Sequence, residues 1–273
     1  STGSWYLVKS EEGIMYDCKI KGKLRLENIN STNPVVVGDI VDFITENQDA
    51  KEIGLIENIH TRKNYILRKS VNLSKQTHII AANIDQAILM VTLKSPDTST
   101  GFIDRFLVSA NAFGVNVVLL FNKTDIYNKK ILDSLEKLIS IYKKIGYECV
   151  KISALNDNLN GVKTILKGKN NLVSGHSGVG KSTFINKLLG TSIPTAEVSL
   201  THDQGKHTTT FSQLYRLDSG GSIIDTPGIK GFGLVNIDVD NLSDYFPEFL
   251  SLKQGCKFNN CKHINEPNCK VKE

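Results

Sequence analysis

One segment of this 273-residue chain, residues 175–182, restricts the possible folds more than any other. Its sequence, GHSGVGKS, fits the pattern G-x-x-x-x-G-K-[ST], in which glycines let backbone N–H groups turn inward around phosphate groups. An apolar stretch typical of a buried strand precedes it, and a helical pattern follows it. This order predicts a phosphate-binding loop at a helix N-terminus within an α/β domain. A glycine-rich turn that matches by chance is the alternative.

The side chains of this loop have distinct expected roles. Lys181 is expected to reach the β- and γ-phosphates of a nucleotide, and the Ser182 hydroxyl is expected to bind Mg²⁺. The residues predicted to contact nucleotide here are Gly175, His176, Ser177, Gly178, Val179, Gly180, Lys181, Ser182 and Thr183.

A second motif, Asn122-Lys123-Thr124-Asp125, directly follows another apolar strand. The Asp125 carboxylate can accept hydrogen bonds from N1–H and the 2-amino group of guanine, whereas adenine presents no donor there. Asn122 can bond another polar edge of the base, and the aliphatic stem of Lys123 can cover its ring. Alone this tetrapeptide is often a solvated turn, but beside a phosphate loop it predicts binding of GTP and GDP.

A third segment extends the predicted base site. Ser153-Ala154 ends the next strand, where a backbone N–H can meet the guanine oxygen. Together with residues 122–125 it forms the predicted base-reading part of the site.

The order of these motifs is unusual. In most GTPases the phosphate loop comes first and the base-reading motif last, but here residues 122–125 precede residues 175–182. The chain is therefore predicted to be a circular permutant, which the sheet tolerates because its original ends lie close together.

Two further segments predict the switches of a GTPase. In Asp225-Thr226-Pro227-Gly228, Asp225 is expected to hold Mg²⁺ through water, and the Gly228 N–H is expected to contact the γ-phosphate. In Gly205-Lys206-His207-Thr208-Thr209-Thr210, Thr209 is the candidate that completes the Mg²⁺ shell. A β-rich surface loop is the alternative for the second segment.

The residue that would orient the attacking water is not the usual one. Ile229 stands where Ras-like enzymes carry the glutamine that does so, and a hydrophobic side chain cannot. Either a partner supplies the group, or another residue does; His207 is the nearest chemically suitable one. The alternative for His207 is a solvated histidine in a loop.

The tail contains a candidate metal site. Cys256, Cys261, His263 and Cys269 offer three thiolates and one imidazole, a complete tetrahedral set for one structural Zn²⁺. The tail has few apolar residues, so we expect the metal to supply its folding energy. A disulfide that leaves one thiol free is the alternative, and Cys18 and Cys149 are interpreted as buried thiols.

The remaining pattern predicts a multidomain protein with three parts. Residues 1–66 carry five short strand patterns, at residues 4–10, 14–20, 23–29, 39–45 and 54–60, typical of an all-β OB-type barrel. An SH3-like barrel is the alternative. Residues 67–235 alternate strands and helices, as expected for an α/β P-loop GTPase domain, and residues 236–273 form the predicted zinc-binding module.

Composition adds limits to this interpretation. The formal charge of +5 is mild and decides nothing by itself. No apolar run reaches the roughly 18 residues that cross a bilayer, and no signal-peptide pattern opens the sequence. We therefore expect a cytoplasmic protein without membrane contact.

The permuted order, the N-terminal barrel and the C-terminal Cys-Cys-His-Cys module together resemble the small-ribosomal-subunit-dependent GTPase family (RsgA, also called YjeQ). The resemblance covers almost the whole chain, and one departure is His176, which stands where the family usually has glutamine. The matching segments are Val37-Gly38-Asp39, Ala81-Ala82-Asn83-Ile84-Asp85-Gln86, Lys206-His207-Thr208-Thr209-Thr210, Asp225-Thr226-Pro227-Gly228-Ile229 and the tail GCKFNNCKHINEPNC.

The resemblance implies a bacterial ribosome-biogenesis factor that binds the small ribosomal subunit and its rRNA late in assembly. It implies hydrolysis of GTP to GDP and phosphate that the subunit stimulates, with His207 matching the proposed catalytic histidine. Relatives continue past the position of Glu273 into a helical extension, so the resemblance implies that this sequence stops short of it. We expect a monomer.

Two other functions remain open from the residues. One is a nucleotide-gated binding protein with negligible turnover, in which GTP only orders the switches. The other is a P-loop nucleoside kinase, whose base preference would be indifferent to Asp125→Asn.

Overall fold

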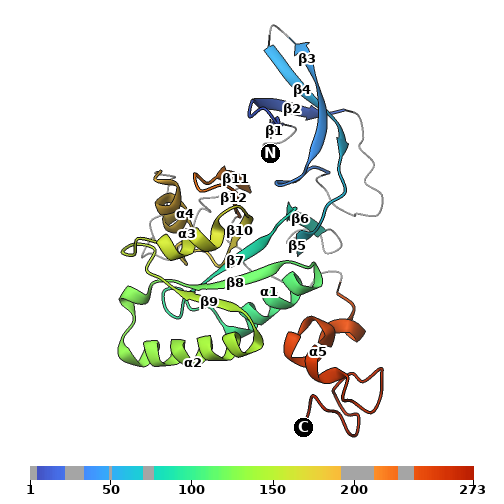
Figure 1. Ribbon diagram of the computed structural model, residues 1–273, viewed down its shortest axis with the longest axis vertical. Helices are drawn as coiled ribbons and strands as arrows, with labels where there is room; N and C mark the ends of the chain where they lie inside the picture. Colours follow the sequence, from blue (N-terminus) through green and yellow to red (C-terminus); the bar gives the residue numbers. More distant parts are fainter. Residues whose placement is uncertain (1–4, 22–33, 49–50, 70–76, 192–211, 227–236) are drawn as a thin grey trace.

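The computed structural model describes residues 5–21, 34–48, 51–69, 77–191, 212–226 and 237–273. These residues form a strand-rich N-terminal domain, a central α/β domain and a small helical C-terminal module, residues 237–273 (Figure 1). The fold class predicted from the sequence is confirmed at this level, because a strand-rich part, an α/β part and a Cys/His-bearing part follow one another in that order.

The N-terminal domain holds a four-stranded sheet in the order β1-β2-β4-β3. Its strands are β1 (Tyr6–Lys9), β2 (Met15–Ile20), β3 (Val41–Gln48) and β4 (Lys51–Ile59). β2 and β4 are parallel, and the other neighbours are antiparallel. Tyr6, Cys18, Val35 and Ile56 form its core, so Cys18 is a buried thiol as predicted. The remaining predicted strand, at residues 23–29, lies outside the described residues.

A hairpin that the sequence analysis did not predict follows this sheet. β5 (Tyr65–Lys69) pairs antiparallel with β6 (Thr77–Ala82). The predicted domain boundary between residues 66 and 67 therefore falls inside a strand.

The central domain is a six-stranded sheet in the order β11-β12-β10-β7-β8-β9. Only β11, at the edge, is antiparallel to its neighbour. The strands are β7 (Gln86–Val91), β8 (Asn116–Phe121), β9 (Glu148–Lys151), β10 (Asn170–Ser174), β11 (Gln213–Arg216) and β12 (Ser222–Asp225). The helices are α1 (Thr100–Ala112), α2 (Lys129–Ile145), α3 (Asn160–Leu166) and α4 (Lys181–Leu189), with a 3₁₀ turn, η1 (Thr124–Ile126), after β8.

Helices cover both faces of this sheet, as the apolar strands require. Leu89 and Leu119 face α1 and α2, whereas Met90 and Leu120 face α3 and α4. Successive side chains of a strand point to opposite faces, so each central strand feeds two cores. Each fully buried apolar side chain contributes about 1.5–3 kcal/mol to stability.

The strand order accounts for the permuted motif order. The chain runs from β7 outward to β8 and β9, then returns to β10 on the other side of β7 and continues to β12. The direction of strand addition therefore reverses between β7 and β10. In open α/β sheets such a switch point, at the carboxyl ends of the strands, is where ligands bind.

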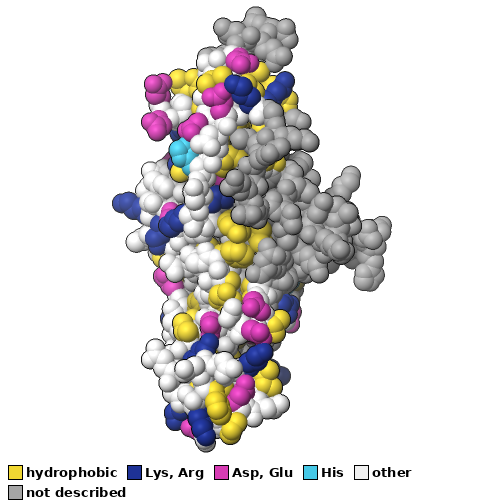
Figure 2. All heavy atoms as spheres, turned by 90° about the vertical axis from the view of Figure 1, so that its right-hand side faces the viewer, with side chains coloured by type: hydrophobic (Ala, Val, Ile, Leu, Met, Phe, Trp, Pro, Cys, Tyr) yellow, Lys and Arg dark blue, Asp and Glu magenta, His cyan; other side chains and the backbone are white. Residues whose placement is uncertain are grey.

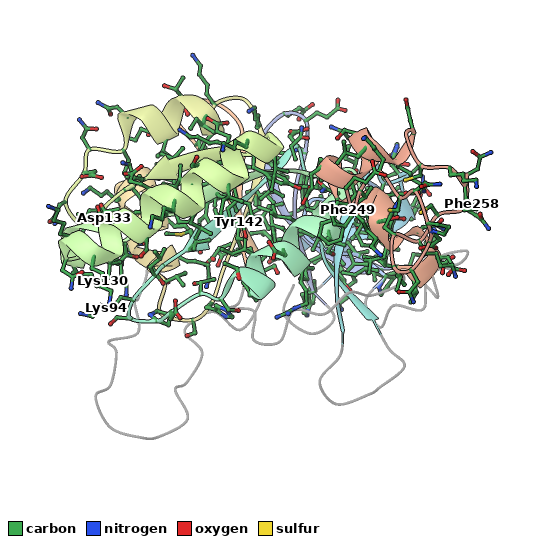
Figure 3. All side chains as sticks on the ribbon, turned by 90° about the horizontal axis from the view of Figure 1, so that it is seen from below. Lys94, Lys130, Asp133, Tyr142, Phe249 and Phe258 are labelled. Atoms are coloured by element: carbon green, nitrogen blue, oxygen red, sulfur yellow. The ribbon has the colours of Figure 1, made fainter. Side chains whose placement is uncertain are left out.

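The C-terminal module contains a 3₁₀ segment, η2 (Val239–Tyr245), and α5 (Pro247–Lys253), neither of which was predicted. Figure 3 shows α1 between α2 and this module. The Asn111 side chain of α1 donates a hydrogen bond of 2.9 Å to the Tyr245 carbonyl. The outer face of the module, at the bottom of Figure 2, carries charged side chains of both signs.

No helix among the described residues is long and apolar enough to cross a bilayer.

A buried ion pair joins the N-terminal domain to the segment that enters the α/β domain. The Arg62 guanidinium donates 2.7 Å hydrogen bonds to both carboxylate oxygens of Asp39, and these side chains are only 5% and 1% exposed. Arg62 also bonds the Pro34 carbonyl, and Asn83 donates to the Gly38 carbonyl. The turn around Asp39 is thereby fixed to the base of the α/β domain.

We predict that Asp39→Asn lowers the free energy of unfolding by about 3–5 kcal/mol, because it leaves the buried Arg62 charge uncompensated. The matched control is Asp42→Asn, which removes an exposed carboxylate that contacts His60 and should change stability little. Urea unfolding of both variants measures the difference. Equal midpoints for the two variants would contradict the prediction.

Candidate functional site

The predicted nucleotide motifs meet at one edge of the central sheet. The phosphate loop follows β10, residues 122–125 follow β8, and Ser153-Ala154 follows β9. Asp225 is the last residue of β12. Because β7, β8, β9, β10 and β12 are parallel, all of these segments lie at the carboxyl ends of the strands. Segments distant in the sequence therefore form one site.

Lys181 belongs to the phosphate loop, is the first residue of α4, and is only 9% exposed. Its Nζ donates 2.9 Å hydrogen bonds to the carbonyls of Gly175 and His176. Burial lowers the pKa of Lys181 to about 8, and the Asp225 carboxylate opposes that shift. A buried ammonium of this kind is stabilised by an anion placed beside it, as a nucleotide phosphate would be.

Asn122 connects the two halves of the site. Its Nδ2 donates to the Val179 carbonyl of the phosphate loop at 2.8 Å, and its Oδ1 accepts from the Ala154 N–H at 2.8 Å. The residue is 2% exposed, so these bonds are shielded from water. The motif predicts a bond from Asn122 to the base, and the structure leaves one Nδ2 hydrogen for such a bond.

Gly180 is required by this connection. A Cβ at Gly180 would lie 2.4 Å from the Asn122 Nδ2, and the backbone has a left-handed φ of +98°. Any side chain here would displace the amide that links the phosphate loop to the base loop.

Tyr127 and Lys123 fix the base loop, and Tyr127 was missed by the sequence analysis. The Tyr127 hydroxyl donates to the Asn122 carbonyl at 2.7 Å and accepts from the Leu93 N–H at 2.8 Å. Lys123 Nζ donates to the Ser95 carbonyl in the same loop after β7. Burial lowers the pKa of Lys123, and Asp125 opposes the shift. No short-range pattern identifies Tyr127, because its partners lie on two different loops.

The base-reading residues have different surroundings. Asp125 is exposed within η1, where its carboxylate can meet a ligand. The Ser153 N–H donates to Asp157 at 2.6 Å, and the Ala154 N–H is bonded to Asn122. A guanine oxygen would have to share these amides, so the roles predicted for Ser153 and Ala154 stay predictions. Leu155 follows Ala154, and its carbonyl accepts a hydrogen bond of 2.6 Å from Lys187 of α4.

Some of the other predicted nucleotide residues are described by the structure, and some are not. The His176 ring packs against the Phe102 ring of α1, with centroids 3.9 Å apart, which orients this side chain toward the helix. Ser182 and Thr183 are half-buried in the first turn of α4. His207, Thr209 and Gly228 lie outside the described residues, and their predicted roles stay predictions.

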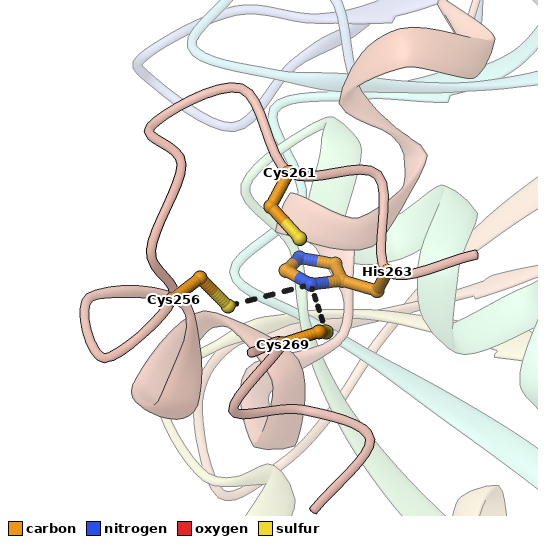
Figure 4. Close-up of side chains that lie close together, drawn as sticks. All are labelled: Cys256, Cys261, His263 and Cys269. Carbon is orange, nitrogen blue, oxygen red and sulfur yellow. Dashed lines mark hydrogen bonds between the residues drawn. The ribbon is translucent and has the colours of Figure 1, made fainter. Parts of the chain in front are cut away.

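The four predicted metal ligands come together in the C-terminal module (Figure 4). Their ligand atoms all lie within 4.8 Å of one another. His263 Nδ1 is 3.3 Å from Cys269 Sγ and 3.7 Å from Cys256 Sγ. Tetrahedral Zn²⁺ with bonds of about 2.3 Å to sulfur and about 2.0 Å to nitrogen puts its ligand atoms roughly 3.5–3.8 Å apart. The cluster therefore has the donors and the spacing to hold such a metal.

The module has almost no other interior. Of residues 237–273, which are all described, only Cys261 and Cys269 are buried. All five cysteines are free thiols, so the disulfide alternative is not seen. A metal ion bound to the cluster would supply the cohesion that apolar burial does not.

The chain matches two families. Residues 59–235 match the RsgA GTPase family, and residues 1–53 match the RsgA N-terminal domain. A protein of Christiangramia forsetii is 54% identical over 275 aligned residues, covering 100% of this chain and 87% of that protein. A protein of Flavobacterium johnsoniae is 52% identical, covering 100% and 84%. Both relatives are named small ribosomal subunit biogenesis GTPase RsgA.

Two solved structures are similar to the whole chain. YjeQ from Thermotoga maritima has a TM-score of 0.75 and 35% identity, covering 99% of this chain and 87% of that one. YloQ, described as a circularly permuted GTPase, has a TM-score of 0.71 and 25% identity, covering 100% and 84%. The permuted order predicted from the motifs is therefore confirmed.

We predict that Gly180→Ala weakens GDP binding roughly 10- to 100-fold, because the new methyl group breaks the hydrogen bonds of Asn122. Gly190→Ala is the matched control at the other end of α4. Gly190 also has a left-handed φ, of +64°, but nothing lies within 4 Å of its Cβ position. The control should lose stability without losing affinity. Fluorescent-GDP titration measures the affinity of both variants. Equal losses of affinity in the two would contradict the prediction.

Proposed function

The chain belongs to the RsgA GTPase family, and we propose that it hydrolyses GTP on the small ribosomal subunit and thereby assists biogenesis of that subunit. The GTPase activity is that of the family. The role on the subunit is supported by relatives that are more than 50% identical over the whole chain and carry that name. The observation that carries the proposal at the site is the Asn122 bridge, because it holds the phosphate loop and the base loop together.

At the phosphate end, Lys181 exchanges its two carbonyl partners for the β- and γ-phosphates of GTP. This exchange is favourable because phosphate is a charged acceptor, and hydrogen bonds to charged acceptors are about twice as strong as neutral ones. The backbone N–H groups from Gly175 to Thr183, with the N-terminus of α4, surround the same phosphates. His176 contributes its backbone there, since its ring packs on Phe102.

At the base end, Asp125 accepts hydrogen bonds from guanine N1–H and the 2-amino group. Its exposure in η1 supports this role, because the carboxylate can be reached by a ligand. Lys123 lies against the base ring through its aliphatic stem, and Thr124 holds the loop by donating its N–H to the Ile152 carbonyl at 3.2 Å. The Ser153 and Ala154 segment receives the guanine oxygen.

Magnesium accompanies GTP in this family, and it would neutralise charge on the phosphates. Ser182 and Asp225 are proposed to hold it, with Thr209 completing the set. Both described candidates lie beside Lys181: Ser182 follows it in α4, and Asp225 acts on its charge.

For the hydrolytic step, we assign His207 to the positioning of the attacking water and the Gly228 N–H to the γ-phosphate. These assignments rest on the sequence, because Ile229 cannot orient water. A group of the subunit that completes this step would make turnover depend on the partner, as GTPases with a trans-acting group do.

The cluster in the C-terminal module is proposed to bind one structural Zn²⁺ through Cys256, Cys261, His263 and Cys269. The donor set supports this assignment. So does the lack of an apolar core in residues 237–273, where only Cys261 and Cys269 are buried. Contact with rRNA, a cytoplasmic location and a monomeric state are parts of the same proposal. The N-terminal domain is the candidate RNA-binding part, as small β-barrels commonly are.

The proposal is tested by single-turnover GTP hydrolysis with and without purified small ribosomal subunits. We expect stimulation of at least about tenfold, because the chain lacks the usual water-orienting glutamine. Lys181→Ala is the control and should lose both basal and stimulated turnover. Equal rates with and without subunits would contradict the proposal and favour a nucleotide-gated binding protein.

Removal of one cysteine tests the zinc assignment. We predict that Cys261→Ser reduces bound zinc from about one ion per chain to nearly none, and that residues 237–273 lose protection from hydrogen exchange. Cys149→Ser is the matched control, since Cys149 is a buried thiol in β9 far from the cluster in sequence. Elemental analysis and exchange mass spectrometry give the readout. Unchanged protection in Cys261→Ser would overturn the assignment.

A further inference from the structure

A groove lies between the α/β domain and the C-terminal module, and none of its lining residues belongs to the nucleotide motifs. It has a volume of about 310 Å³ and is lined by residues of α1 and α2, by Tyr147, and by Tyr245, Phe246 and Glu248 of the module. Figure 3 shows α2, with Tyr142, and the C-terminal module, with Phe249, on opposite sides of α1. This volume is at the lower end of the range for ligand sites, roughly 300–1,000 Å³.

The floor of the groove is an apolar stripe on α2. Leu138, Ile141 and Ile145 recur at helical spacing and line it, together with Leu107 of α1. Ile141 is 54% exposed, although it lies beside buried Tyr142. A helix face with this spacing usually packs against another apolar surface.

The charged residues that line the groove are acidic. Asp104 of α1 accepts a hydrogen bond of 2.7 Å from the Tyr142 hydroxyl, and Glu248 lies on the opposite wall. Burial raises the pKa of Tyr147, and Glu248 and Asp104 raise it further, so both carboxylates act on the groove. No lysine or arginine is among the lining residues.

Ring contacts connect the wall of the groove to the Cys/His cluster. The Phe246 ring stacks on Phe249 at 5.1 Å, and the Phe249 ring meets the His263 ring edge-on at 6.3 Å. The Asn111 amide binds both the Tyr147 hydroxyl and the Tyr245 carbonyl, which joins the wall to α1. The groove is therefore a built feature of the interface between the two parts.

We propose that this groove docks a basic, apolar peptide segment of a protein of the small ribosomal subunit. The apolar stripe receives aliphatic or aromatic side chains, and Asp104 and Glu248 meet a lysine or arginine beside them. Charge complementarity of this kind selects partners and increases association rates. The inference rests on the proposed function and adds a surface to it.

The lining decides between protein and RNA as the occupant. A phosphate backbone would meet two carboxylates and no cation in the groove, which is unfavourable. An apolar floor also offers nothing to phosphate or ribose, whereas it suits peptide side chains bound in a groove.

The test compares two substitutions on the same helix. Ile141→Lys places a cation on the groove floor, and Leu132→Lys changes another exposed apolar side chain of α2, 36% against 54% exposed, that does not line the groove. We expect Ile141→Lys to weaken cosedimentation with small subunits at least about tenfold, and Leu132→Lys to leave it within about twofold. Basal GTP turnover and zinc content should be unchanged in both.

The outcomes separate this inference from the proposed function. If the wild-type chain does not sediment with subunits, the proposed function is wrong and the groove loses its partner with it. If the wild-type chain sediments and Ile141→Lys binds equally well, only the groove inference is overturned. Glu248→Gln provides a second variant without added bulk, and it should weaken binding severalfold.

A photo-crosslinking residue in place of Ile141 identifies the occupant. We expect an adduct with a ribosomal protein when the variant is irradiated on small subunits. An adduct with rRNA alone, or with a second copy of this chain, would overturn the proposal.

Discussion

The nucleotide site depends on the two hydrogen bonds of the Asn122 carboxamide. The carboxamide joins the loop after β10 to the loop after β9, although these loops are separated by the whole of α3 and β10 in the chain. Because the residue is almost completely buried, an unsatisfied amide here would cost about 1–3 kcal/mol. Gly180 and Tyr127 serve this contact, one by leaving space for it and the other by fixing its backbone. The geometry of the site is thus a property of the sheet edge and not of any one loop.

Parts of this arrangement could be predicted because their determinants are local. The helices Lys129–Ile145 and Lys181–Leu189 have local boundary signals, since an Asn128 cap or a phosphate loop begins them and Gly146 or Gly190 ends them. The four metal ligands were found from residue type and spacing alone. The permuted order followed from two motifs and their sequence positions.

Other parts could not be predicted because their determinants are distant in the sequence. The β5–β6 hairpin has no turn motif among its described residues, and the C-terminal helices lack a continuous apolar face. The Tyr127 hydroxyl and the His176–Phe102 contact join loops and helices that meet only in the folded domain. The hydrogen bonds of both Asn122 side-chain polar atoms to other parts of the protein are likewise visible only in the structure. The motif alone predicts only that Asn122 bonds a ligand.

Lys181 and Asp125, brought into one site through Asn122, are expected to bind the two ends of one guanine nucleotide. Calorimetric titration of the zinc-loaded chain with GDP and with ADP measures the base preference of this site. We expect GDP to bind roughly 100-fold or more tightly than ADP, because adenine leaves the Asp125 carboxylate without its two donors. Equal affinities for the two nucleotides, or no binding of either, would contradict this expectation.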